Sequence, residues 1–175
     1  PVRTSLGKLQ GDIPGATTAV TELKAEFLAK NFPGEPEKLD NANAVSDSTE
    51  AELAKVKKAY EEQRYLAARK RLETVGGNIQ SATDDLVEIH TRLAKLRELR
   101  SHSRNVVKQS ADLSVALSTK LETNSFTTSE ATDQAYKRQM PVLGIQQIDV
   151  VKDITDWPAA ADNADKLLAA LKAVD

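Results

Sequence analysis

Residues 72–96 read LETVGGNIQSATDDLVEIHTRLAKL. Apolar residues recur in this stretch at alternating spacings of three and four, at Leu72, Val75, Ile79, Ala82, Leu86, Ile89, Leu93 and Leu96. This is a heptad pattern, and it puts all of these side chains on one stripe of an α-helix. Such a stripe packs either against a second chain or against other helices of the same chain. We favour packing within the chain.

Gly76 and Gly77 interrupt this helix-forming stretch. Each glycine costs about 1 kcal/mol inside a helix relative to alanine, whereas a glycine just past a helix end adopts the left-handed backbone that terminates it. We therefore predict one helix that ends at Val75 and another that starts near Asn78 and runs to about Thr123. The heptad phase continues through both glycines, so one uninterrupted helix is the alternative.

Prolines and glycines also divide the N-terminal part of the chain. We expect residues 1–12 to be an irregular N-terminal segment, followed by a helix to about Asn31 with Pro14 in its first turn, where proline is tolerated. Residues 32–36, Phe-Pro-Gly-Glu-Pro, turn the chain. A second helix is expected to begin between residues 37 and 47. Its buried face is predicted to include Leu53, Val56 and Tyr60.

Residues 127–175 are predicted to form short C-terminal helices that pack on the bundle. Residues 127–130 have the pattern of a helix-capping box, and residues 142–155 fit a helix better than a strand, although a strand stays open there. The last helix is predicted from Trp157, with an inward stripe of Ala161, Ala164, Leu168, Leu171 and Val174. The sequence thus predicts an all-α fold: an antiparallel helical bundle with one or two long helices, forming a single domain over residues 1–175.

Composition excludes several classes of protein. The chain has 175 residues and no cysteine, which removes disulfide scaffolds, thiol catalysis, zinc fingers and iron–sulfur centres. Lysine and arginine number 24 and aspartate and glutamate 26, so the net charge of −2 does not indicate a protein that coats nucleic acid. No apolar run approaches the ~20 residues of a membrane span. The chain opens at Pro1 without a signal-like segment, so we expect a trimmed or processed piece.

Two histidines are the first candidates for catalysis or metal binding. His90 follows the core residue Ile89 and has no Glu or His four residues away, so we interpret it as a solvated or edge-packed side chain. His102 has Glu98 one turn earlier, which is an ordinary helix-surface pair without a third ligand. No serine-hydrolase elbow, Rossmann fingerprint or P-loop is present. We therefore expect no catalytic residue, no metal site and no cofactor, and we interpret the chain as not an enzyme.

Positive charge is concentrated in the middle of the chain. Residues 53–108 carry 13 basic and 7 acidic side chains, a net charge of +6, while the segments before and after them carry −4 each. The candidate partner-binding basic face comprises Arg92, Lys95, Arg97, Arg100, Arg104 and Lys108. The alternative is that the acidic flanks neutralise this charge across the bundle. No aromatic platform accompanies the charges, so we do not expect nucleic-acid binding.

Two stretches resemble known helical families. Residues 65–72, YLAARKRL, have the spacing Tyr-x-x-Ala-x-x-x-Leu and resemble the second helix of tetratricopeptide-type and spectrin-like repeats. The stretch from Ile13-Pro14 through the alanine-rich residues 60–96 resembles helical accessory regions of bacterial envelope proteins with a TPM domain, a phosphatase-like domain that is not part of these residues. The resemblance implies an extracytoplasmic helical region with no catalytic residues of its own.

These observations predict a non-enzymatic structural or protein-interaction module of a bacterial cell-envelope protein. The alternative is an extracytoplasmic ligand-sensing helical bundle, which needs a pocket with convergent polar groups between its helices. We expect the partner to be another protein or a second copy of the chain, with membrane contact only through segments outside it. The expected location is extracytoplasmic or in the cell envelope, and a cytoplasmic location stays open.

Overall fold

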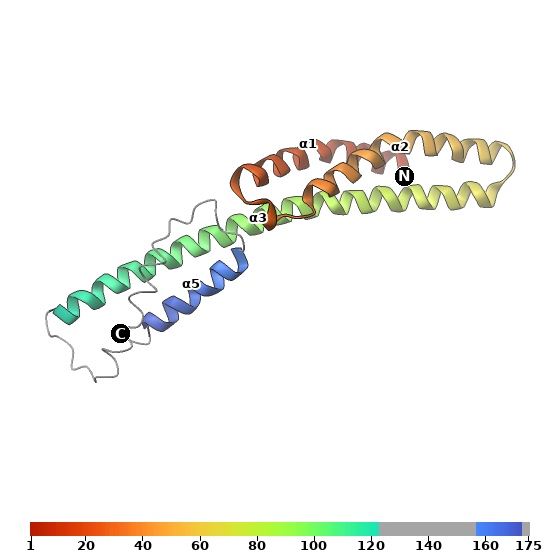
Figure 1. Ribbon diagram of the computed structural model, residues 1–175. Helices are drawn as coiled ribbons and strands as arrows, with labels where there is room; N and C mark the ends of the chain where they lie inside the picture. Colours follow the sequence, from red (N-terminus) through yellow and green to blue (C-terminus); the bar gives the residue numbers. More distant parts are fainter. Residues whose placement is uncertain (123–156, 173–175) are drawn as a thin grey trace. The chain divides into compact units, whose positions relative to one another are not determined.

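The computed structural model describes residues 1–122 and 157–172, and every regular element in these ranges is helical. The elements are α1 (Val2–Glu26), the 3-10 turn η1 (Ala29–Asn31), α2 (Glu35–Glu61), α3 (Tyr65–Glu122) and α5 (Trp157–Lys172) (Figure 1). The predicted all-α fold with a long helix is confirmed. The chain divides into two compact units, residues 1–94 and 95–175, and α3 contributes to both. That these units make a single domain stays a prediction.

The first unit is a bundle of α1, α2 and the N-terminal part of α3. Helix α1 packs against α2. Its buried face comprises Leu6, Leu9, Ala16, Ala19, Val20 and Leu23. Helix α3 contributes the heptad stripe, which is buried from Val75 onward, whereas Leu72 is 40% exposed. Burial of each Leu or Ile side chain stabilises the fold by roughly 1.5–3 kcal/mol, so this stripe and the buried face of α1 together stabilise the unit.

The prediction that residues 1–12 are irregular is wrong, because α1 begins at Val2. Pro14 therefore lies inside the helix, where it leaves the Gln10 carbonyl without its intrahelical donor at a cost of about 3 kcal/mol. Both residues are exposed, so water can bond that carbonyl. Leu6 and Leu9 are buried and extend the apolar face of α1. Their burial contributes roughly 3–6 kcal/mol and outweighs the cost of the proline.

The predicted break at Gly76 and Gly77 is also wrong. Helix α3 is continuous there, and neither glycine has a positive φ. Val75 and Ile79, on either side of the pair, are both buried, so an unbroken helix keeps the stripe in register with the core. The free energy gained by burying the stripe residues on both sides of the glycines exceeds the roughly 2 kcal/mol that two glycines cost in a helix.

The hairpin turn lies instead at residues 62–64, between α2 and α3. Gln63 has a φ of 60°, the left-handed backbone in which many helices end. The Gln63 N–H donates to the Tyr60 carbonyl and the Arg64 N–H donates to the Ala59 carbonyl, both at 2.9 Å. These two bonds form a Schellman motif, which satisfies the last carbonyls of α2. The sequence has no glycine at this turn to predict it.

The α2–α3 hairpin continues beyond the N-terminal end of α1 (Figure 1). Helix α2 starts at Glu35, slightly before its predicted window, because α1 ends early, at Glu26. Because α1 does not reach the turn between α2 and α3, that end of the hairpin consists of two helices rather than three (Figure 1). Leu53 and Val56 are half-buried there, but Tyr60, which we predicted on the buried face, is exposed.

The second unit comprises the C-terminal part of α3 together with α5. The buried face of α5 consists of Trp157, Ala161, Ala164, Leu167 and Leu171. It differs from the predicted stripe in that it includes Trp157 and in that Leu167 is more deeply buried than Leu168. The predictions for residues 127–155 and for Val174 lie outside the described residues.

Candidate interaction surface

Arg92, the first residue of the predicted basic face, has an intramolecular role. Its Nε donates to the Asn31 backbone carbonyl at 2.7 Å, and Nε lies 4.0 Å from a carboxylate oxygen of Glu35. Glu35 is itself buried and accepts a hydrogen bond from the Gly34 N–H at 3.1 Å. Arg92 thus ties the connection between α1 and α2 to α3, and it is not available as part of an open basic surface.

The other five residues of that face belong to the second unit and do not share one side of α3. At 100° per residue, Lys95 falls on a different side of the helix from the remaining four, which are Arg97, Arg100, Arg104 and Lys108. Arg97 and Arg100 have interaction partners of their own. Lys95, Arg104 and Lys108 are exposed. Binding of a partner by these residues stays a prediction.

The two histidines have different surroundings. The exposed His90 is edge-packed, as predicted: a Cβ added at Gly15 of α1 would lie 3.6 Å from its Nε2. The Nε2 of His102 on α3 lies 2.9 and 3.0 Å from the two carboxylate oxygens of Asp165 on α5. The sequence suggested Glu98 as the neighbour of His102 and missed Asp165, because 63 residues separate the pair. The pair is exposed and joins α5 to α3.

The most conspicuous surface of the first unit is the end of the α2–α3 hairpin. We call Tyr60, Tyr65, Leu66 and Leu72 the tip surface; their exposed fractions are 64%, 56%, 85% and 40%. The Tyr60 and Tyr65 rings stack edge to face, with centroids 5.2 Å apart and an interplanar angle of 69°. Leu66 lies about 100° around α3 from Tyr65, so the two stacked rings are the continuous part of this surface. Exposed large apolar side chains in contact mark interaction sites more often than scattered ones do. Sequence reasoning missed this surface because it placed Tyr60 and Leu72 on buried stripes.

The tip surface is surrounded by charge. Residues 52–73 contain seven basic and four acidic side chains, a net charge of +3. The acidic side chains are paired: Arg64 lies 2.6 Å from Glu62, Arg69 lies 2.9 Å from Glu73 and Lys57 lies 3.8 Å from Glu61. Exposed pairs of this kind contribute about 0–1 kcal/mol each to stability. Because the basic side chains outnumber the acidic ones by three, the net charge of this end of the hairpin is positive.

One edge of the α2–α3 interface is held by polar contacts. Lys38 forms an ion pair with Glu88, and the Asn41 amide donates to Asp85 at 3.1 Å. The hydrogen bond with Glu88 is the main cause that raises the pKa of Lys38 above its ordinary value. Helical periodicity puts Ser48 and Asn78 on the same edge, further toward the tip.

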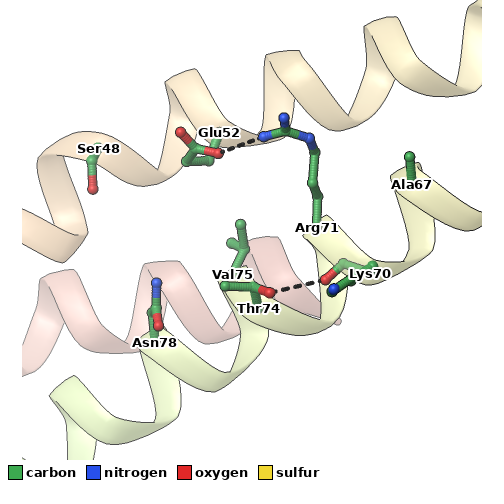
Figure 2. A pocket seen from close by; sticks show the side chains of 8 residues that line it. All are labelled: Ser48, Glu52, Ala67, Lys70, Arg71, Thr74, Val75 and Asn78. Carbon is green, nitrogen blue, oxygen red and sulfur yellow. Dashed lines mark hydrogen bonds and ion pairs between the residues drawn. The ribbon is translucent and has the colours of Figure 1, made fainter.

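At this edge an open pocket of about 580 Å³, which we call the hollow, lies between the two helices (Figure 2). Its lining comprises Ser48, Glu52, Ala67, Lys70, Arg71, Thr74, Val75 and Asn78. Figure 2 shows Glu52 of α2 reaching toward Arg71 of α3, and the two charged groups are 3.6 Å apart. A hydrogen bond from Lys55 is the main cause that lowers the pKa of Glu52, and the charge of Arg71 adds to it. In the described part of the chain, no carboxylate pairs with Lys70.

Comparisons with known proteins add no relative. The chain has no significant match among protein-family models, curated proteins or solved structures. Within the described ranges, no cluster of three or more histidine, aspartate or glutamate side chains could hold a metal ion. None of the described helices has an apolar stretch long enough to cross a bilayer.

Proposed function

We propose that this chain is a non-enzymatic helical module that binds another protein through the tip surface. The observation that carries the proposal is the exposure of four large apolar side chains near one end of a two-helix hairpin, two of which, Tyr60 and Tyr65, are in ring contact. Tyrosine is enriched at protein interfaces, because it offers a large, rigid contact area and a polar hydroxyl. When a partner covers such side chains, each Å² of apolar area removed from water favours binding by roughly 25 cal/mol of free energy.

Charge distinguishes the partner from a second copy of the tip. Two tips that meet would bring a net charge of +3 against +3. Like charges across an interface disfavour association. A different protein with acidic groups around an apolar patch complements this surface better.

We propose further that the module belongs to a bacterial cell-envelope protein, outside the cytoplasm. This part of the proposal is supported only by the resemblance of Ile13-Pro14 and residues 60–96 to accessory regions of such proteins.

The experiment that tests the proposal replaces Tyr65 by photoreactive benzoyl-phenylalanine, in the full-length protein in cells of its source organism. The exposed Ala25 of α1 receives the same group as a control. We expect one protein to cross-link from position 65 and not from position 25. With purified components, that protein is expected to bind the chain about tenfold or more weakly when Tyr60→Ser and Leu66→Ser are combined. Unchanged binding by this double variant would contradict the proposal, as would cross-links only to lipid or to a second copy.

A ligand-sensing module is the second candidate, and the hollow between α2 and α3 favours it. Ser48, Lys70, Arg71 and Asn78 bring hydrogen-bond donors to this hollow. A small anionic molecule could replace Glu52 as the partner of Arg71. Titration with inorganic phosphate and with succinate, followed by NMR of the Arg71 side chain, tests this. Shifts that saturate in the unchanged chain and vanish in Lys70→Ala support it, and the absence of saturable shifts counts against it.

A further inference from the structure

The face of α3 that contacts α1 continues beyond the end of α1. His90 marks this face, because its imidazole lies against Gly15 of α1. Leu72 lies eighteen residues before His90, which corresponds to five complete helical turns and hence to the same face. Tyr65 lies seven residues nearer the tip, only about 20° from that face. At the tip this face is therefore apolar and exposed.

Helix α2 repeats this arrangement. Tyr60 lies eighteen residues after Ala42, again five turns, and Ala42 is fully buried in the three-helix part of the unit. Tyr60 and Tyr65 meet across the hairpin with their rings 5.2 Å apart. On α2, a position that is buried where three helices pack is thus repeated as the exposed Tyr60 where only two are present. On α3, the exposed side that His90 presents at the edge of α1 is repeated as Leu72 and, about 20° away, as Tyr65. We use the term groove residues for Tyr60, Tyr65 and Leu72, the exposed apolar side chains of the two helices beyond α1.

Helix α1 shows what kind of segment packs on the α2–α3 hairpin. It is amphipathic, and its buried side chains, such as Leu6, Leu9 and Ala16, recur at helical spacing. A second helix with the same spacing, placed along the hairpin beyond α1, would cover the groove residues as α1 covers the rest.

The charge around the groove residues indicates which side chains should stand beside the apolar stripe of such a helix. Residues 52–73 have a surplus of three positive charges after their carboxylates are paired. Glutamate or aspartate beside the apolar stripe of the incoming helix would face this surplus. An anionic lipid surface also attracts basic and aromatic side chains. The register that Tyr60 shares with the buried Ala42, and Leu72 with the His90 position beside α1, favours a packed helix over a lipid surface.

We propose that the groove residues bind an amphipathic α-helix of a partner protein, one with an apolar stripe and acidic flanks, as the third helix of the hairpin end. This inference rests on the proposed function and specifies the class of partner. It corresponds to helix-in-groove recognition, in which residues spaced at three and four anchor the helix.

The test uses a synthetic peptide of about 18 residues with leucine at the spacing of the buried face of α1 and glutamate on the flanks. Its binding to the full 175-residue chain is followed by fluorescence anisotropy. We expect it to bind about tenfold or more tightly than a peptide of the same composition with the stripe scrambled, and more tightly than a lysine-flanked peptide. Tyr65→Ser combined with Leu72→Ser is expected to weaken binding about tenfold. Val115→Ser, at an exposed position in the second unit, is the matched control and should leave binding unchanged.

Equal binding of the three peptides would overturn the inference. Binding of phosphatidylglycerol vesicles, lost in the same double variant, without peptide binding would also overturn it. In either case, a protein cross-linked from position 65 would still support the proposed function. If no protein cross-links from position 65, the proposed function fails even where the peptide binds.

Discussion

Gln63 has a left-handed backbone at the α2–α3 turn, a conformation that costs a residue with a side chain roughly 1–2 kcal/mol. Gly76 and Gly77, which could adopt it freely, have helical backbone instead. The Schellman bonds at residues 59–64 and the buried stripe through Val75 impose this arrangement. Each of the three residues is therefore less suited to its backbone than another residue would be.

Replacing these residues is expected to stabilise the protein. No atom lies within 4 Å of a Cβ added at Gly76 or Gly77, so Gly76→Ala and Gly77→Ala should each raise the free energy of unfolding by about 0.5–1 kcal/mol. Gln63→Gly should raise it as well, because glycine adopts the left-handed backbone without strain. Urea unfolding followed by circular dichroism measures all three. Destabilisation by the alanines would indicate a turn at residues 76–77.

Glu52 should make stability depend on acid pH. Its pKa is lowered from 4.5, chiefly by the hydrogen bond from Lys55. A lowered pKa favours folding at pH values above 4.5, and this contribution is lost as the pH falls through the lowered value. We expect Glu52→Gln to destabilise the protein near neutral pH and to make little difference at about pH 3. Urea unfolding at the two pH values tests this, with the exposed Glu50→Gln as the matched control; a difference that persists at the lower pH would contradict it.

At the scale of elements, periodicity predicted the helices whose apolar pattern is strong and failed at their ends. The stripe of α3 from Val75 onward and the positions Ala161, Ala164 and Leu171 on the inward face of α5 follow from spacing alone. The start of α1 does not, because Gly7, Gly11 and Pro14 lower its intrinsic helix preference. Only packing of Leu6 and Leu9 in the bundle makes this segment helical, and packing between distant residues cannot be read from local sequence.

Leu9→Ala tests this explanation of α1. The Leu9 side chain is completely buried, so its truncation should lower the free energy of unfolding by about 2–4 kcal/mol. The exposed neighbour Lys8→Ala should change it by no more than about 0.5 kcal/mol. Thermal and urea unfolding give both values. Equal and small effects would mean that residues 1–12 are irregular, as the sequence alone suggests.

For the whole molecule, the fold class was predictable and the tip surface was not. A stripe on α3 indicates which side chains face other helices, but not where a covering helix ends. The exposure of Tyr60 and Leu72 depends on the position of the turn at residues 62–64 relative to the start of α1 at Val2. Both boundaries are set by tertiary packing. No short stretch of the sequence therefore predicts which side chains between them are exposed.

The division into two units predicts that they respond separately to core substitutions. Trp157 is the only tryptophan and lies in the second unit, so its fluorescence reports on that unit. Leu171→Ala removes a fully buried side chain of α5 and should lower the tryptophan-detected transition by about 2–4 kcal/mol. Leu9→Ala should leave that transition in place while shifting the one seen by circular dichroism. Coincident shifts would support the single domain that the sequence predicts.

The turn at residues 62–64 also has a kinetic consequence. Its bonds join residues a few positions apart, such as Ala59 and Arg64, whereas the contact between Gly15 and His90 spans most of the first unit. Contacts between near neighbours in the chain close much sooner than distant ones, so folding is expected to nucleate at the hairpin, with α1 docking last. Stopped-flow measurements should then show that substitutions at the turn slow refolding, while substitutions in α1 mainly accelerate unfolding.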